Sequence, residues 1–166
     1  DVPVIAYSGT FEAYQGLVVL LAAIPLVTAT HPDAVFVLIG ARGDDEARLL
    51  RSGVGNRHVK VIARQPRPRS LELLGAADVL VSPRAFGDNV PLKIFDYLAA
   101  AKPIVATDIA AHRALLDEHR AVLVQPAKLA AGLLAVLADP PRAAALAAAG
   151  RAYAEEHLGW LSFVRS

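Results

Sequence analysis

The sequence predicts an α/β fold built around a single doubly wound, mostly parallel sheet with helices on both faces. Short apolar runs rich in β-branched residues alternate with helix-like segments along almost the whole chain. Each run is three to six residues long, is bounded by Gly, Pro, Asp or Ser, and is nearly continuous in apolar character. Strands buried on both faces of a parallel sheet have this pattern. Connections that contain a helix form βαβ units, which place helices on both sides of the sheet.

The expected elements follow one another in regular alternation. The strands are Val2–Tyr7, Val35–Ile39, Val59–Ile62, Val79–Ser82, Ile104–Ala106 and Ala121–Val124. The connecting segments predict helices near Gln15–Thr30, Asp44–Arg51, Ser70–Gly75, Pro91–Ala100, Ala110–Leu116 and Lys128–Leu137. A last helix is expected from Pro141 to about Leu158, because it follows an Asp-Pro start signal and proline suits a first helical turn.

Length and composition limit the possible classes of protein. The 166 residues fit one domain, spanning 1–166, and the net charge of +1 gives no bulk reason to expect nucleic acid or an anionic membrane as a partner. Arg64, Arg67 and Arg69 do cluster, and the simplest interpretation of them is a solvated loop. Cysteine is absent, which excludes disulfides, thiol catalysis and cysteine-based zinc sites. The five histidines lack metal-ligand spacing and are expected at the surface or at helix caps.

The chain carries no obvious targeting or anchoring segment of its own. No apolar run reaches the roughly 18 residues of a membrane span. Methionine is absent, even at position 1, and the sequence starts directly before a strand-like run. We therefore expect the chain to be a piece of a longer protein.

Residues that follow the strands are the candidates for ligand contact, since open parallel sheets bind ligands beyond the carboxyl ends of their strands. Three loops stand out, at Ser8–Gly16, Gly40–Asp44 and Pro83–Pro91. In the first, Gly9 would let the backbone approach a ligand, and the amides of a helix start suit phosphate. The same residues also suit an ordinary turn, and neither a dinucleotide fingerprint nor a P-loop is present.

The third loop runs into a helix and contains two carboxylates eight residues apart, Asp88 and Asp96. Pro91 is expected at the first helical position, which would leave the amides of Val90, Leu92 and Lys93 free to hold an anion. Asp88 near the mouth could meet a sugar hydroxyl, and Asp96 could take both hydroxyls of a ribose. The alternative is that Asp88 or Asn89 only caps the helix and that Asp96 is a solvated helix residue.

The stretch DNVPLKIFDYLAAAKPIVAT at 88–107 resembles the signature of the family 4 (group 1) retaining glycosyltransferases of the GT-B fold. That signature has an acidic residue, seven others, a second acidic residue, and then a small-residue helix end before K/R-P-[IV]-V-A. The resemblance extends to YSGTFEAYQG at 7–16 and AADVLVSPR at 76–84, and covers essentially the whole chain. It implies the C-terminal, donor-binding domain, the Rossmann-like half of the GT-B fold.

The resemblance also implies roles for individual residues. Asp88 matches the acid that approaches the donor sugar and is the expected catalytic residue, while Asp96 matches the acid that binds the ribose. The remaining expected contacts to the nucleotide sugar are the phosphate-side turn, the nucleobase segment and the loop that meets diphosphate and sugar, at Gly9, Thr10, Arg64, Pro66, Asn89, Val90, Pro91, Leu92 and Lys93. Pro91 has no N–H to offer.

Two departures from the family pattern bear on activity. Both motif acids are usually glutamate and here are aspartate, one methylene shorter. The basic pair that the family has on its first loop corresponds to the uncharged Thr10 and Gln15. Arg84 and Lys93 are the nearby cations that could replace it.

The function implied by the resemblance is transfer of a sugar from a UDP- or GDP-sugar to a glycan or lipid-linked acceptor, as in polysaccharide biosynthesis. No metal or other cofactor is expected. The acceptor would bind a missing N-terminal domain, so the isolated chain should be inactive, and the location would be the cytoplasm, including the inner membrane face through the missing domain. Two alternatives stay open: a catalytically silent nucleotide-binding or interaction module of the same fold, and a sugar-nucleotide epimerase-like domain.

Overall fold

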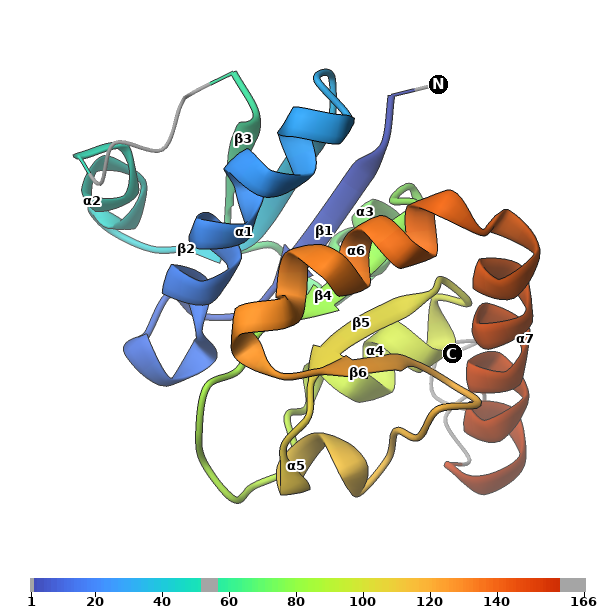
Figure 1. Ribbon diagram of the computed structural model, residues 1–166. Coiled ribbons are helices and arrows are strands. Elements are labelled where there is room, and N and C mark those ends of the chain that lie inside the picture. The colour runs from blue at the N-terminus through green and yellow to red at the C-terminus, as the bar shows by residue number, and fades with distance from the viewer. Residues whose placement is uncertain (1, 52–56, 159–166) are drawn as a thin grey trace.

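A six-stranded parallel sheet forms the centre of the computed structural model, which describes residues 2–51 and 57–158 (Figure 1). The strands are β1 (Val4–Ser8), β2 (Val35–Ala41), β3 (Val59–Ala63), β4 (Val79–Ser82), β5 (Ile104–Thr107) and β6 (Val122–Val124). Their order in the sheet is β3-β2-β1-β4-β5-β6, and every neighbouring pair is parallel. The predicted fold class is confirmed, and each predicted strand lies within two residues of its observed bounds.

Helices cover both faces of this sheet, with α1 and α6 on one face and α3 and α4 on the other (Figure 1). The α-helices are α1 (Leu17–Thr30), α2 (Asp45–Arg51), α3 (Arg67–Gly75), α4 (Lys93–Ala99), α5 (Ala110–Arg113), α6 (Leu129–Ala138) and α7 (Pro140–His157). Single 3₁₀ turns at Ala13–Gln15 and Pro126–Lys128 precede α1 and α6. Each predicted helix is present, although several boundaries differ.

Two of these differences matter for the site. Helix α3 begins at Arg67, three residues before the predicted start, because Pro68 fits its first turn, where the missing N–H is not needed. Helix α4 begins at Lys93 and not at Pro91, so the predicted first helical position is wrong. The amide of Ile94 donates to the Pro91 carbonyl (3.0 Å), which makes a tighter turn ahead of the helix.

The core consists of two layers, one on each face of the sheet. On β1, Ile5 and Tyr7 pack with α1 and α6, whereas Ala6 between them packs with Leu74 of α3 and Ile94 of α4. All five residues are buried. Burial of both strand faces explains why the strand sequences are continuously apolar and do not alternate.

Helix α7 closes the far side of the domain by packing against α4. The carboxylate of Asp139 caps it by accepting the amide of Arg142 (3.0 Å), and Arg151 donates to the Ala99 carbonyl at the end of α4 (2.6 Å). Among the described residues no single helix is long and apolar enough to cross a membrane, and one bent pair, Pro126–Ala138 with Pro140–His157, passes that test by length and composition.

The strand order reverses at β1 and β4, the place where such sheets bind ligands. The loops after these two strands pack against each other: the amide of Ala85 donates to the Tyr14 carbonyl (3.2 Å). The hydroxyl of Tyr97 on α4 accepts from the Ser8 amide (2.9 Å) and donates to the Val81 carbonyl (3.0 Å). The carboxyl ends of β1 and β4 are thereby held in a fixed relation to α4.

Candidate functional site

A polar cavity of about 360 Å³ opens at the carboxyl edge of the sheet. It brings together four residues that the sequence predicts as contacts, Gly9, Thr10, Arg64 and Asp96. They come from the loops after β1 and β3 and from α4. The other lining residues are Ser8, Ile39, Gly40, Arg42, Gln65, Arg67 and Ser70.

Two glycines allow the floor of this cavity to form. The amide of Gly9 donates to the carbonyl of Ile39 (2.9 Å), which brings the end of β1 against the end of β2. Gly40 has a φ of 123°, and a Cβ placed on it would lie 2.1 Å from the Gly9 carbonyl oxygen. The two backbones therefore touch directly, and only glycine fits at position 40.

Asp96, in the first turn of α4, carries the one carboxylate that lines the cavity. Its Oδ1 accepts two hydrogen bonds from Arg67, one from Nε (3.2 Å) and one from Nη2 (2.8 Å). Burial raises the pKa of Asp96, and the Arg67 guanidinium opposes that increase. Asp96 is thus a partly buried acid with a single strong partner, and the alternative of a solvated helix residue is wrong.

The cavity is positively charged overall, since Arg42, Arg64 and Arg67 line it together with Asp96. A concave surface with an excess of arginine favours an anionic ligand. Arg67 and Arg69 both lie in α3 and not in a loop, so that part of the interpretation is wrong. Arg69 is solvent-exposed, as expected, and pairs with Glu72 (2.7 Å), whereas Arg67 pairs with Asp96 and lines the cavity. Sequence reasoning also missed Arg42, although the Gly40–Asp44 loop was expected to lie near a ligand.

Lys93 brings a positive charge to the loop after β1. Its ammonium donates to Gln15 Oε1 (2.9 Å) and lies 4.1 Å from the centroid of the Tyr7 ring. A Cβ placed on Gly9 would lie 2.7 Å from Lys93 Nζ. Gln15 also contacts the Thr10 hydroxyl (3.4 Å). The ammonium of Lys93, from α4, therefore lies beside the uncharged Gln15.

The environment of Lys93 destabilises its charge. Burial of the ammonium, with a smaller contribution from the nearby Arg84 guanidinium, lowers the pKa of Lys93 to about 7. No carboxylate in residues 2–51 and 57–158 forms an ion pair with it. An anion bound near this ammonium would restore the protonated form.

Arg84 organises the loop after β4. It is buried, and its guanidinium donates to the carbonyls of Phe86 (3.0 Å) and Asn89 (2.8 Å). Its own carbonyl accepts the hydroxyl of Thr107 (2.5 Å). The structure thus uses Arg84 to shape residues 84–89, and a contact of Arg84 with diphosphate stays a prediction.

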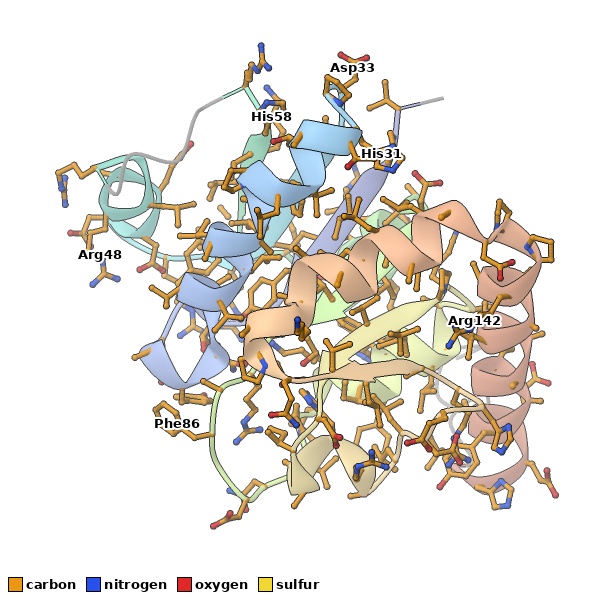
Figure 2. All side chains as sticks on the ribbon, in the orientation of Figure 1. His31, Asp33, Arg48, His58, Phe86 and Arg142 are labelled. Atoms are coloured by element: carbon orange, nitrogen blue, oxygen red, sulfur yellow. The ribbon has the colours of Figure 1, made fainter. Side chains whose placement is uncertain are left out.

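The loop that Arg84 shapes presents Asp88 to solvent. Asp88 and Asn89 are exposed, and Asp88 does not line the cavity around Asp96. Neither residue caps α4, whose N-cap is Leu92 with no side-chain hydrogen bond, so that alternative is wrong. Phe86 and Leu92 are also exposed, at 61% and 81%, and Figure 2 shows Phe86 on the opposite side of the molecule from His31 and Asp33.

The remaining predicted contacts lie around the same edge. Val90 is partly buried and Pro91 is buried. Pro66 is exposed at the N-cap of α3, next to the cavity residue Gln65. Their contacts with a ligand stay predictions.

His112 contradicts the expectation that the histidines lie at the surface or at caps, because it is fully buried. Its Nδ1 donates to the Thr107 carbonyl (2.7 Å), which fixes the tautomer, and its Nε2 accepts the Ser82 hydroxyl (2.8 Å). Burial lowers the pKa of His112 to about 4, so the ring is neutral near pH 7. His112 thereby joins the ends of β4 and β5 beneath the loop that Arg84 shapes.

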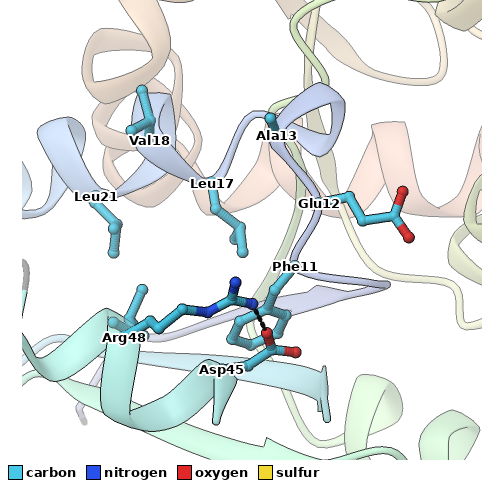
Figure 3. Close-up of a pocket in the computed structure, with 9 residues that line it drawn as sticks. Phe11, Glu12, Ala13, Leu17, Val18, Leu21, Asp45 and Arg48 are labelled. Carbon is cyan, nitrogen blue, oxygen red and sulfur yellow. Dashed lines mark hydrogen bonds and ion pairs between the residues drawn. The ribbon is translucent and has the colours of Figure 1, made fainter. Parts of the chain in front are cut away.

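A second groove, of about 380 Å³, lies between α1 and α2 (Figure 3). Its walls are mainly apolar and are formed by Phe11, Leu17, Leu21 and Leu49. Asp45 and Arg48, which also line the groove, form an ion pair with each other. The cavity around Asp96 is the better match for a phosphate-bearing ligand. No three histidine, aspartate or glutamate side chains in the described part of the chain are grouped to hold a metal ion.

The strand order defines a Rossmann-like α/β protein, and its cationic cavity lies at the carboxyl edge of the sheet, at the ends of β1, β2 and β3. The sequence profile of the family described as Glycosyl transferases group 1 matches residues 2–139. The chain belongs to this family. The resemblance found at 88–107 is thus confirmed.

The curated relatives include mannosyltransferases. The phosphatidyl-myo-inositol mannosyltransferase of Mycolicibacterium smegmatis is 30% identical over 132 residues, which cover 77% of this chain and 34% of the relative. A GDP-mannose-dependent monoacylated alpha-(1-6)-phosphatidylinositol monomannoside mannosyltransferase of Corynebacterium glutamicum is 30% identical over 168 residues, 95% of this chain and 44% of the relative. The chain therefore spans less than half the length of these relatives.

Solved structures share the fold at lower sequence identity. The Anabaena protein HepE, in complex with UDP-glucose, matches with a TM-score of 0.81 at 18% identity, over 94% of this chain and 44% of that protein. The C-terminal domain of the group 1 glycosyl transferase LpcC of Francisella tularensis matches with a TM-score of 0.78 at 17% identity, over 95% of this chain and 88% of that domain. The fold class is therefore that of GT-B glycosyltransferases.

Proposed function

We propose that this chain is the donor-binding half of a retaining glycosyltransferase and that the cavity around Asp96 holds the nucleoside diphosphate of its sugar donor. The observation that carries the proposal is the composition of this cavity. It combines one partly buried carboxylate, Asp96, with three arginines and the Gly9–Thr10 backbone. A carboxylate suits sugar hydroxyls, and the excess positive charge suits a diphosphate.

The donor would lie along the carboxyl edge of the sheet. Asp96 accepts from the ribose, and the nucleobase lies along Arg64–Pro66, beside the start of α3. The diphosphate then rests on Gly9 and Thr10, close to the Lys93 ammonium, and the sugar extends toward Asp88 and the Asn89–Leu92 loop. As the glycosidic bond breaks, negative charge grows on the departing diphosphate, and fixed cations and amides there stabilise the transition state.

GDP-mannose is the donor that we propose first. Both relatives described above are named as mannosyltransferases, and the name of the second specifies GDP-mannose. The UDP-glucose in the HepE structure makes UDP the competing nucleotide. No cofactor or metal enters the proposed reaction.

Sugar transfer would need the other half of the protein. Because the chain spans less than half of its relatives, we propose that the acceptor binds a second, N-terminal domain and that transfer occurs between the two. The relatives' names, which specify phosphatidylinositol compounds, support a lipid-linked acceptor. A location at the inner face of the membrane is part of the same proposal. The 166-residue chain alone should not transfer mannose, and turnover by it would contradict this part of the proposal.

A catalytically silent nucleotide-binding module is the second candidate. It is favoured by the uncharged Thr10 and Gln15 and by aspartate in both acid positions. Lys93 beside Gln15 argues against it, because the charge missing from the first loop is supplied from α4. Donor binding without transfer by the full-length protein would establish the silent module.

Calorimetric titration of the chain at pH 8 with GDP, UDP, ADP and NAD tests the proposal. We expect GDP to bind with one-to-one stoichiometry and UDP to bind more weakly. ADP and NAD should bind at least about tenfold more weakly than GDP, because the loss of one polar contact changes affinity by roughly that factor. Absence of binding to every nucleoside diphosphate would refute the donor-binding function.

The same titration reports on Lys93 when it is repeated in buffers of different ionisation enthalpy. The pKa of Lys93, about 7 in the free protein, should rise when phosphate binds, so binding at pH 8 takes up about one proton. At pH 6 the lysine is already charged and should take up almost none. Affinity should fall as pH increases above 7. Lys93→Gln should abolish the uptake at pH 8; uptake that persists in this variant would assign the proton to another group.

A further inference from the structure

Arg67 and Asp96 join the two elements that border the cavity. Arg67 is the first residue of α3, directly after the proposed nucleobase segment, and Asp96 is in the first turn of α4. The two hydrogen bonds from Arg67 to Asp96, from Nε (3.2 Å) and Nη2 (2.8 Å), go to the same oxygen, Oδ1. Within the part of the chain that the structure describes, no hydrogen bond to Oδ2 of Asp96 is found.

This asymmetry limits what the carboxylate can offer a ligand. Each carboxylate oxygen has two lone-pair sites, and on Oδ1 both are filled by Arg67. An unpaired carboxylate could accept the 2′- and 3′-hydroxyls of a ribose on its two oxygens. In the geometry observed here only Oδ2 is open, so the two hydroxyls cannot each take a separate oxygen. If both shared Oδ2, they would compete for the same charge and each would bind less strongly, so one hydroxyl is favoured.

We propose, on the basis of the donor-binding function above, that Arg67 is a positioning residue that stays paired with Asp96 in the donor complex, so that Asp96 accepts a single ribose hydroxyl on Oδ2. Displacing Arg67 would leave a partly buried carboxylate without its cation, and a neutral hydroxyl does not compensate the lost charge. The arginine therefore remains in place, and ribose recognition is unequal between the two hydroxyls.

Arg67 has a second effect on the same carboxylate. Burial raises the pKa of Asp96, and Arg67 is the group that opposes the increase. Without Arg67, Asp96 would keep its proton at higher pH and would lose acceptor strength for the hydroxyl. The proposed role thus includes keeping Asp96 ionised over the pH range in which the donor binds.

Deoxynucleotides test the single-hydroxyl geometry. The chain is titrated with GDP, 2′-deoxy-GDP and 3′-deoxy-GDP, and in parallel with the three uridine counterparts. We expect one deoxy analogue to bind about tenfold more weakly than the parent nucleotide and the other to bind within about twofold, because a hydrogen bond to a charged group contributes roughly that factor. Equal losses for both analogues, or no loss for either, would overturn the proposal.

Arg67→Met tests the positioning role separately from the fold. In the wild type the ratio of GDP affinity to the affinity of the weaker deoxy analogue should stay constant between pH 7 and pH 5. In Arg67→Met it should fall toward one as the pH decreases, because Asp96 becomes protonated. The shared titration of the phosphates cancels in this ratio. Arg69→Met, two residues further along α3 and paired with Glu72, is the matched control and should behave as wild type.

The outcomes separate the two proposals. A wild-type chain that binds neither GDP nor UDP refutes the donor-binding function and the role of Arg67 with it. A chain that binds GDP but has a pH-independent ratio in Arg67→Met retains the donor-binding function and refutes the role of Arg67 alone.

Discussion

Asp96→Ala should weaken the binding of GDP by about 30-fold. The substitution removes the ribose's hydrogen bond to a charged acceptor, and the ribose is then less firmly oriented. The carboxylate is the one that lines the cavity, and it is held by Arg67 on one oxygen and open on the other. The same substitution should remove the difference between GDP and its deoxy analogues, because the group that senses the ribose hydroxyl is gone. Calorimetric titration measures both effects.

The matched control for this variant is Asp33→Ala. Asp33 is exposed in the turn between α1 and β2, at the opposite edge of the sheet from the cavity (Figure 2). It removes the same charge from the protein, so any general electrostatic effect on an anionic ligand appears in both variants. An Asp96→Ala chain that binds GDP as tightly as Asp33→Ala would show that the ribose lies elsewhere.

Gly16→Ala should lower the free energy of unfolding by about 3 kcal/mol or more, among the largest effects of a single substitution in this domain. Gly16 has a φ of 74°, a conformation that costs other residues on the order of 1 kcal/mol. A Cβ placed there would lie 1.8 Å from the Pro83 carbonyl oxygen. That atom belongs to the backbone and cannot rotate away, so the loops after β1 and β4 would have to separate.

Gly43→Ala isolates the conformational part of this effect. Gly43 also has a positive φ, 53°, but a Cβ placed on it meets nothing within 4 Å. We expect it to lower the free energy of unfolding by about 1 kcal/mol, the cost of the backbone conformation alone. Denaturant unfolding of the two variants measures the difference. If Gly16→Ala is as mild as Gly43→Ala, the loops do not depend on this close contact.

The fold could be predicted because its signals are local. Strands buried on both faces read as continuous apolar runs, and helices between them complete a repeating unit. The predicted helix boundaries are wrong where a tertiary contact sets the local backbone conformation. Helix α4 starts at Lys93 because Ile94 bonds to the Pro91 carbonyl, in a loop whose shape depends on Arg84.

The site could be predicted only in part. The motif at 88–107 predicts Asp96, and the position of Gly9 directly after the first strand predicts Gly9; the structure places both in one cavity. The pair of Arg67 with Asp96 has no local signal, because the two residues are 29 positions apart and meet only when α3 and α4 pack on the same face of the sheet. The burial of His112 is weakly indicated by Ser82, a polar residue at the end of an otherwise buried strand. Once it is enclosed, Ser82 needs a hydrogen-bond partner.

A crystal structure of the chain with GDP is the most direct test of the central claim, that the cavity around Asp96 is the nucleotide-sugar site. We expect one ribose hydroxyl within hydrogen-bond distance of Asp96 Oδ2, with Arg67 still on Oδ1, and the diphosphate against Gly9 and Thr10. GDP bound in the apolar groove between α1 and α2, with Asp96 contacting only Arg67, would contradict it.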